Sequence, residues 1–111
     1  MNISTLLRQG VLIVRVEGEL DMHVADEFRQ RVDDALDSCG AKNLILNLEG
    51  VSFIDSSGLG VILGRYKRIS NNGGKVSATN VQSQVAKIFE LSGLFRIMKL
   101  YESENQALES L

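Results

Sequence analysis

A polar turn between a strand pattern and a helix pattern most constrains the fold of this 111-residue chain. Asn43–Leu48 is a short apolar run whose leucines fall on alternate positions, which predicts a buried strand. Apolar side chains then recur at helical spacing over about Leu59–Asn71. The intervening stretch Val51–Gly60 contains an acid and two adjacent hydroxyls. One such side chain suffices to cap a helix start, so we expect one serine to be presented to another molecule.

Strand and helix patterns alternate along the rest of the chain. Two strands, Ile3–Leu7 and Val11–Val16, are expected to form a hairpin around Arg8–Gly10. The further elements expected are a helix carrying Val24, Phe28, Val32 and Leu36 and closed by Gly40, the strand Asn43–Leu48, a helix with the stripe Leu59, Ile62, Leu63, Tyr66 and Ile69, a strand at Lys75–Thr79, a helix with Val81, Val85, Ile88 and Phe89, a strand at Ile97–Tyr101 and a helix capped by Ser103. This order, β-β-α-β-α-β-α-β-α, predicts an α/β fold in one domain over residues 1–111. Its sheet should be mixed but mostly parallel, with about four helices.

Two polar loops are predicted to meet at one edge of this sheet. One contains Asp21, after the second strand, and the other contains Asp55 and Ser56, after the third. Because sites in such folds gather at the carboxyl ends of strands, we expect the two loops to be neighbours. Asp21 and His23 are also candidate caps of the first helix.

Composition excludes several classes of partner. The net charge is −2 and no basic stripe is present, which argues against a nucleic-acid groove binder. No apolar run approaches the roughly 20 residues that cross a bilayer, and no signal pattern opens the chain. Cys39 is the only cysteine, so an intramolecular disulfide and a cysteine metal site are excluded. We therefore expect a cytoplasmic protein with no metal, cofactor, nucleic-acid or membrane partner.

Three kinds of chemistry can be weighed at the turn. A hydrolytic nucleophile elbow needs Gly two residues before its serine, where Ser56 has Ile54, and its only candidate base is His23. A phosphate cradle at Gly58–Gly60 lacks the lysine of a P-loop. A phospho-accepting receiver domain needs an acidic pair after its first strand, where this chain has Arg8–Gly10. A nucleotide-binding or hydrolytic module using the Asp55–Gly60 loop remains the alternative, although we expect no enzyme.

Ser56 can instead be the substrate of another protein's kinase. A phosphate adds about −1.5 to −2 charge, which a helix N-terminus tolerates. A partner surface that buries this charge without a counter-charge loses affinity. A turn and helix cap with no further role explains the same residues, and the residues alone slightly favour this explanation.

The same residues resemble the STAS domains, and among them the bacterial anti-sigma factor antagonists. Asp55–Val61 resembles their phosphorylation motif, and Gly18–Asp21 resembles the loop before their first helix. Leu91–Phe95 is similar to their segment after the third helix, and Val61–Lys67 is similar to the antagonists of the sporulation sigma-F system. The element order matches along essentially the whole chain.

This resemblance implies a regulator rather than an enzyme. The unmodified protein would bind an anti-sigma factor that is also a serine kinase, and would thereby free the sigma factor. The kinase would phosphorylate Ser56 and release the product, and a PP2C-type phosphatase would restore the active form. Ser57, inside the first helical turn, should be less reachable than Ser56. The residues expected to contact the partner are Asp21, Asp55, Ser57, Gly58 and Leu59, with Gly58 allowing the partner's backbone to approach closely.

Overall fold

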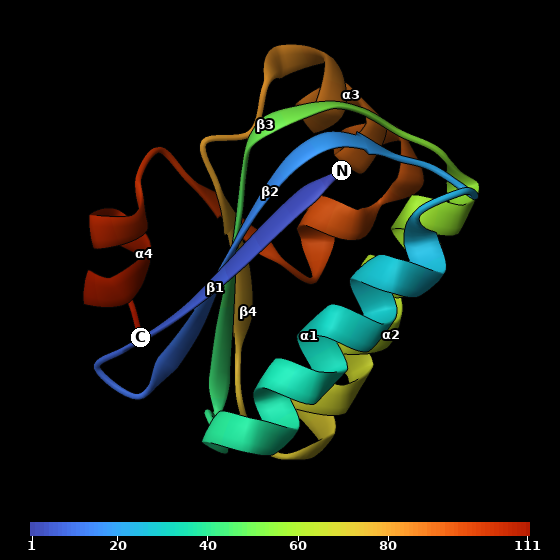
Figure 1. Ribbon diagram of the computed structural model, residues 1–111. Helices are drawn as coiled ribbons and strands as arrows, with labels where there is room; N and C mark the ends of the chain where they lie inside the picture. The colour runs from blue at the N-terminus through green and yellow to red at the C-terminus, as the bar shows by residue number, and fades with distance from the viewer.

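A computed structural model describes all residues from 1 to 111 and contains one five-stranded sheet (Figure 1). The strands lie side by side in chain order: β1 (Asn2–Arg8), β2 (Val11–Leu20), β3 (Asn43–Ile54), β4 (Val76–Thr79) and β5 (Lys99–Tyr101). β1 pairs antiparallel with β2 through a tight hairpin, and all other neighbours are parallel. The predicted mixed, mostly parallel sheet is thus confirmed.

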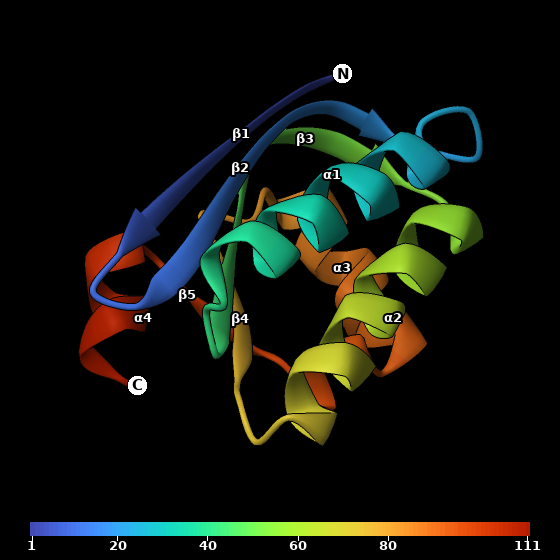
Figure 2. The same ribbon diagram turned by 60° about the horizontal axis from the view of Figure 1, so that its bottom comes forward.

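Three of the α-helices pack on one face of the sheet, and a fourth packs on the other face (Figure 2). The helices are α1 (Ala25–Cys39), α2 (Ser56–Asn71), α3 (Ser83–Ser92) and α4 (Glu104–Glu109), with a short 3-10 helix η1 (Leu94–Arg96) after α3. Right-handed crossovers between strands that advance in one direction place all their connecting helices on the same face. None of the helices has the length and apolar character needed to cross a bilayer.

Each face of the sheet carries its own apolar cluster. The larger cluster of 21 buried residues joins the sheet to α1, α2 and α3 and includes Phe28, Leu46 and Phe89. The smaller one packs Ala107 of α4 against Val11, Ile13 and Ile45. Leu44, Leu46 and Leu48 share the face of the larger cluster, as the alternating pattern predicts.

Two strands are longer than the sequence pattern indicates. β2 runs to Leu20 instead of ending near Val16, and β3 runs to Ile54 instead of ending at Leu48. Their parallel pairing continues to Leu20 opposite Ile54, across register shifts after Arg15 and after Gly18. These shifts break the period of two, so the alternating pattern stops before the strands do. β5, in contrast, begins only at Lys99, because the N–H groups of Ile97 and Met98 donate to the Leu94 carbonyl and close the end of η1.

Several helix ends are set by the predicted residues, but the start of α1 is not. Gly40 has φ of 65° after α1, and Ser103 Oγ accepts the N–H of Gln106 at 3.2 Å to cap α4. The expected capping of α1 by Asp21 or His23 is wrong, because the residue before α1 is Val24 and no side chain caps this helix. The Asp21 carboxylate instead accepts the N–H of His23 at 3.0 Å, which closes a local turn.

Glu104 ties α4 to the sheet. Its two carboxylate oxygens accept hydrogen bonds from the Arg15 guanidinium, each at 2.9 Å, and one of them also accepts the Asn47 amide at 2.7 Å. The hydrogen bonds from Arg15 lower the pKa of Glu104 from 4.5 to about 2, with a smaller contribution from Asn47. Glu104 therefore stays ionised, and α4 is held by a charge-assisted contact as well as by Ala107.

Candidate functional site

The carboxyl ends of β2 and β3 lie side by side and form the base of the candidate site. Leu20 is paired with Ile54, the last residue of each strand, and the Asp55 N–H donates to the Leu20 carbonyl at 3.3 Å. The chain leaves β2 into the Asp21 loop and leaves β3 directly into α2. The prediction that the Asp21 and Asp55–Ser56 loops are neighbours is confirmed.

Asp55 connects these two loops through both of its carboxylate oxygens. Oδ1 accepts the Gly58 N–H at 2.9 Å and caps α2, whereas Oδ2 accepts the Met22 N–H at 2.9 Å. The Gly58 amide is the main cause of a lowered Asp55 pKa, and the Met22 and Ser57 amides act in the same direction. Asp55 is therefore ionised and links the two loops by hydrogen bonds within the chain. Both of its carboxylate oxygens already have partners.

Ser56 is the first residue of α2, which begins there and not at Leu59 as the apolar stripe indicates. Its side chain is exposed, whereas that of Ser57 is half-buried. The free N–H groups and the helix dipole at this position favour negative charge. Ser56 is thus the more accessible of the two hydroxyls, and it lies where a helix favours negative charge.

Gly58 lies beneath the site and not on its surface. It is buried, and a Cβ at this position would lie 2.2 Å from the Leu20 carbonyl oxygen and 2.8 Å from Ile54 Cγ2. The close approach that requires glycine here is between the first turn of α2 and the end of β2. The expectation that Gly58 makes room for a partner's backbone is therefore wrong.

Two exposed apolar side chains belong to the same end of the sheet and were missed by the sequence reasoning. Met22 is 69% exposed and Phe53 is 45% exposed. The Met22 N–H contacts Asp55, and Phe53 lies on β3 two residues before Asp55. Of the other expected contact residues, Asp21 and Leu59 are half-buried, and Leu59 packs partly against the main core. An apolar residue inside the polar run Asp21–His23 was the available signal for Met22.

The geometry does not favour the alternative chemistries of this loop. His23 is exposed, and neither Ser56 nor the His23 ring takes part in a side-chain hydrogen bond within the chain, so a nucleophile–base pair is not assembled. The Gly58 N–H, which a phosphate cradle would need, is bonded to Asp55. What the site offers is an exposed hydroxyl on a helix start, with Met22 and Phe53 at the same end of the sheet.

Replacing Asp55 by Asn tests whether its two hydrogen bonds, from the Gly58 and Met22 amides, stabilise the fold. An amide has one acceptor oxygen, so one of the two N–H groups loses its partner, and we expect the thermal midpoint to fall by roughly 5 °C at pH 7. The folded-state pKa of Asp55 lies below its ordinary 3.8. Its stabilisation is therefore complete at pH values above 3.8 and is lost as the pH falls through the folded-state pKa.

Thermal unfolding of the natural chain and of Asp55→Asn, at pH 7 and at about pH 2, checks this expectation. We expect the two thermal midpoints to converge at the lower pH. Asp34→Asn is the matched control, because Asp34 is exposed and makes no side-chain hydrogen bond. Equal midpoints at pH 7, or a difference that persists unchanged at pH 2, would contradict the assigned role of Asp55.

Comparison with known proteins identifies the family of the chain. The model of the STAS domain family matches residues 2–107. An anti-sigma F factor antagonist of Paenibacillus polymyxa is 46% identical over 93% of this chain and 88% of its own length. A Thermotoga maritima protein assigned to the anti-sigma factor antagonists has a TM-score of 0.91 at 30% identity, covering 97% of this chain and 92% of its own.

The Bacillus cell fate determinant SpoIIAA, an anti-sigma factor antagonist, is similar in two states. Its unphosphorylated form matches with a TM-score of 0.75 at 25% identity, covering 98% of this chain and 96% of its own. Its phosphorylated form matches with a TM-score of 0.75 at 28% identity, covering 98% of each chain. The two forms thus match this chain with the same TM-score.

Proposed function

The chain belongs to the STAS domain family and within it to the anti-sigma factor antagonists, and we propose that a single phosphate on Ser56 switches it off. The observation that carries this proposal is the placement of Ser56, exposed on the first residue of α2, beside a half-buried Ser57. The 46% identity to an anti-sigma F factor antagonist supports a sporulation sigma factor as the one controlled.

The unmodified chain binds an anti-sigma factor that is also a serine kinase, and the sigma factor is released. Ser56 Oγ then attacks the γ-phosphorus of ATP, the bond to the β-phosphate breaks, and ADP leaves. The serine proton passes to a base of the kinase. A PP2C-type phosphatase later hydrolyses the phosphoserine with water, which returns the free hydroxyl and inorganic phosphate. Because ATP and sigma factors are cytoplasmic, the cycle is placed in the cytoplasm.

The fold is expected to survive phosphorylation. A negative charge at the first residue of a helix is stabilised by the dipole by about 0.3–1 kcal/mol. The carboxylate of Asp55, the nearest acid in sequence, already accepts hydrogen bonds from the Gly58 and Met22 amides. The equal TM-scores of this chain with both forms of SpoIIAA support a switch without refolding.

The docking surface comprises the exposed and half-exposed side chains around Ser56. Met22 and Phe53 supply apolar area, and Asp21, Ser57 and Leu59 flank the acceptor. Asp55 and Gly58 contribute indirectly, because they fix the positions of the Asp21 loop and of the first turn of α2. Their substitution is expected to affect docking through the position of Ser56 and not through lost contacts.

Single alanine variants identify the acceptor. Ser56→Ala should still bind the kinase but take up no phosphate, because the reachable hydroxyl is gone. Ser57→Ala is the matched control and should be phosphorylated like the natural chain. Phosphate uptake is measured by mass after incubation with ATP and the anti-sigma kinase. Equal uptake by Ser56→Ala would refute the assignment of Ser56.

A further inference from the structure

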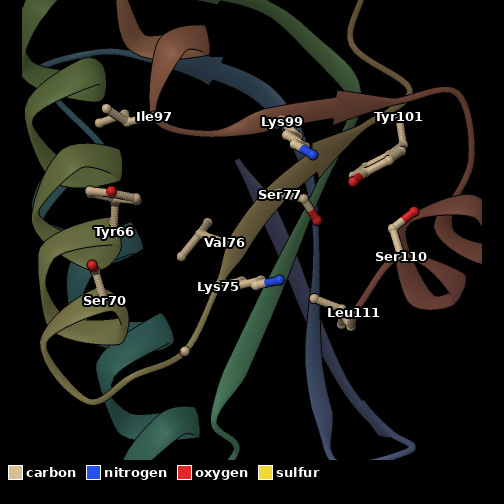
Figure 3. A pocket seen from close by; sticks show the side chains of 11 residues that line it. Tyr66, Ser70, Lys75, Val76, Ser77, Ile97, Lys99, Tyr101, Ser110 and Leu111 are labelled. Atoms are coloured by element: carbon tan, nitrogen blue, oxygen red, sulfur yellow. The ribbon is translucent and has the colours of Figure 1, made fainter.

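We propose that a cavity between β4, β5 and the C-terminal half of α2 binds a small anionic molecule with an apolar or aromatic body. The cavity measures about 220 Å³ (Figure 3). Its polar lining includes Lys75, Ser77, Lys99 and Tyr101, and its apolar lining includes Tyr66 and Ile97. Tyr66 lies ten residues after Ser56 on α2, roughly 15 Å along the helix axis, so the cavity is distinct from the phosphorylation site.

The shortness of β5 opens this cavity. β5 has only three residues and pairs with Ser77, Ala78 and Thr79 of β4. The chain before Ser77 therefore has no strand neighbour on this side. α2 borders the space on one side with Tyr66 and Ser70, and the residues after β5 border it on the other (Figure 3).

The sheet register gathers polar groups on one side of the cavity. Ser77 is paired with Lys99, and Lys75 lies two residues earlier on the same face. The polar ends of Lys99, Tyr101 and Ser77 turn toward one another (Figure 3). The five ion pairs of the chain involve neither lysine, so both positive charges are uncompensated. Such a set of donors suits a phosphate or carboxylate group.

The Ser77 hydroxyl is buried without a hydrogen-bond partner, as is that of Thr79 on the same strand, and of the two only Ser77 lines the cavity. Ser77 is only 4% exposed. Buried polar groups are nearly always paired, and an unpaired hydroxyl destabilises the fold. An anion held by Lys75 and Lys99 would accept the Ser77 hydrogen bond.

The apolar lining and the size restrict the rest of the ligand. Tyr66, Val76 and Ile97 form the wall away from the Lys99–Tyr101 group, and Ile97 is 42% exposed. The volume corresponds to about seven water molecules, which admits one ring or a short chain with a single acidic group.

A titration of the full chain with phenyl phosphate, followed by amide chemical shifts, tests the site. We expect saturable chemical-shift changes at residues 75–77 and 97–101. Inorganic phosphate, which lacks the ring, and phenol, which lacks the phosphate group, should each bind much more weakly. Shifts centred on residues 55–60, no saturable shifts, or equal affinity for inorganic phosphate would overturn the proposal.

Variants separate binding from folding. The double variant Lys75→Gln/Lys99→Gln should bind at least about tenfold more weakly, whereas Lys87→Gln, an exposed lysine on α3, should bind normally. Ser77→Ala should weaken binding by about tenfold and yet raise the thermal midpoint of the free protein, because it removes the unpaired hydroxyl. A purely structural Ser77 would lower the midpoint on substitution, which would refute its role. Ser56→Ala should bind phenyl phosphate unchanged, so failure of the kinase switch and failure of this site are distinguishable.

Discussion

The Ser56→Asp variant is expected to bind the anti-sigma kinase about a hundred- to several-thousand-fold more weakly than the natural chain while keeping its fold. Docking would bury the new carboxylate among exposed apolar groups such as Met22 and Phe53. An unpaired buried charge costs about 3–5 kcal/mol, and each 1.4 kcal/mol is a tenfold change in affinity. The helix start itself tolerates the charge, so the loss appears in binding and not in folding.

Calorimetric titration of the kinase with each variant measures this effect. Ser83→Asp is the matched control, because Ser83 is also exposed and is the first residue of another helix, α3. It adds the same charge in the same helical position on a different helix, and should bind like the natural chain. Unchanged affinity of Ser56→Asp, or an equal loss for Ser83→Asp, would contradict the electrostatic switch.

Gly58→Ala is expected to be the most destabilising conservative change at the site. The new methyl group would lie 2.2 Å from the Leu20 carbonyl oxygen, which is backbone and cannot rotate away. Either α2 or the end of β2 must shift, and overpacking of this kind lowers the free energy of unfolding by about 3 kcal/mol. The shift would also disturb the Asp55 cap on the Gly58 N–H.

Gly64→Ala in the same helix provides the control for this change. A Cβ at Gly64 meets no atom within 4 Å, so alanine should raise the free energy of unfolding by about 0.5–1 kcal/mol through its better helix propensity. Urea unfolding of both variants gives the comparison. A Gly58→Ala protein as stable as the natural chain would show that the contact with Leu20 does not constrain the turn.

The element order and the meeting of the two loops could be read from the sequence because both follow from local patterns. Alternating leucines in β3, the helical stripe of α2 and the parallel connections suffice to place Asp21 and Asp55 at one sheet edge. The far ends of β2 and β3 could not be read in this way. Gly50 faces Glu17 so closely that a Cβ would lie 2.6 Å from the Glu17 side chain, within the part of the ladder where the register shifts.

Local sequence patterns also could not predict the parts of the site that depend on contacts between distant segments. Ser56 was predictable as a hydroxyl at a helix start, but the Met22–Asp55 hydrogen bond depends on how β2 and β3 align. Gly58 was predicted to face a partner because a sequence does not reveal that Leu20 lies against it. Tyr66 belongs to the apolar stripe of α2 as expected, yet it is half-buried and lines the cavity opened by a short β5.

Intact mass and phosphosite mapping, after incubation with ATP and the anti-sigma kinase, test the central claim most directly. We predict one added phosphate, located on Ser56, and dissociation of the complex as it accumulates. A tight complex that takes up no phosphate, or a phosphate located on Ser57, would contradict the assignment of Ser56 as the switch.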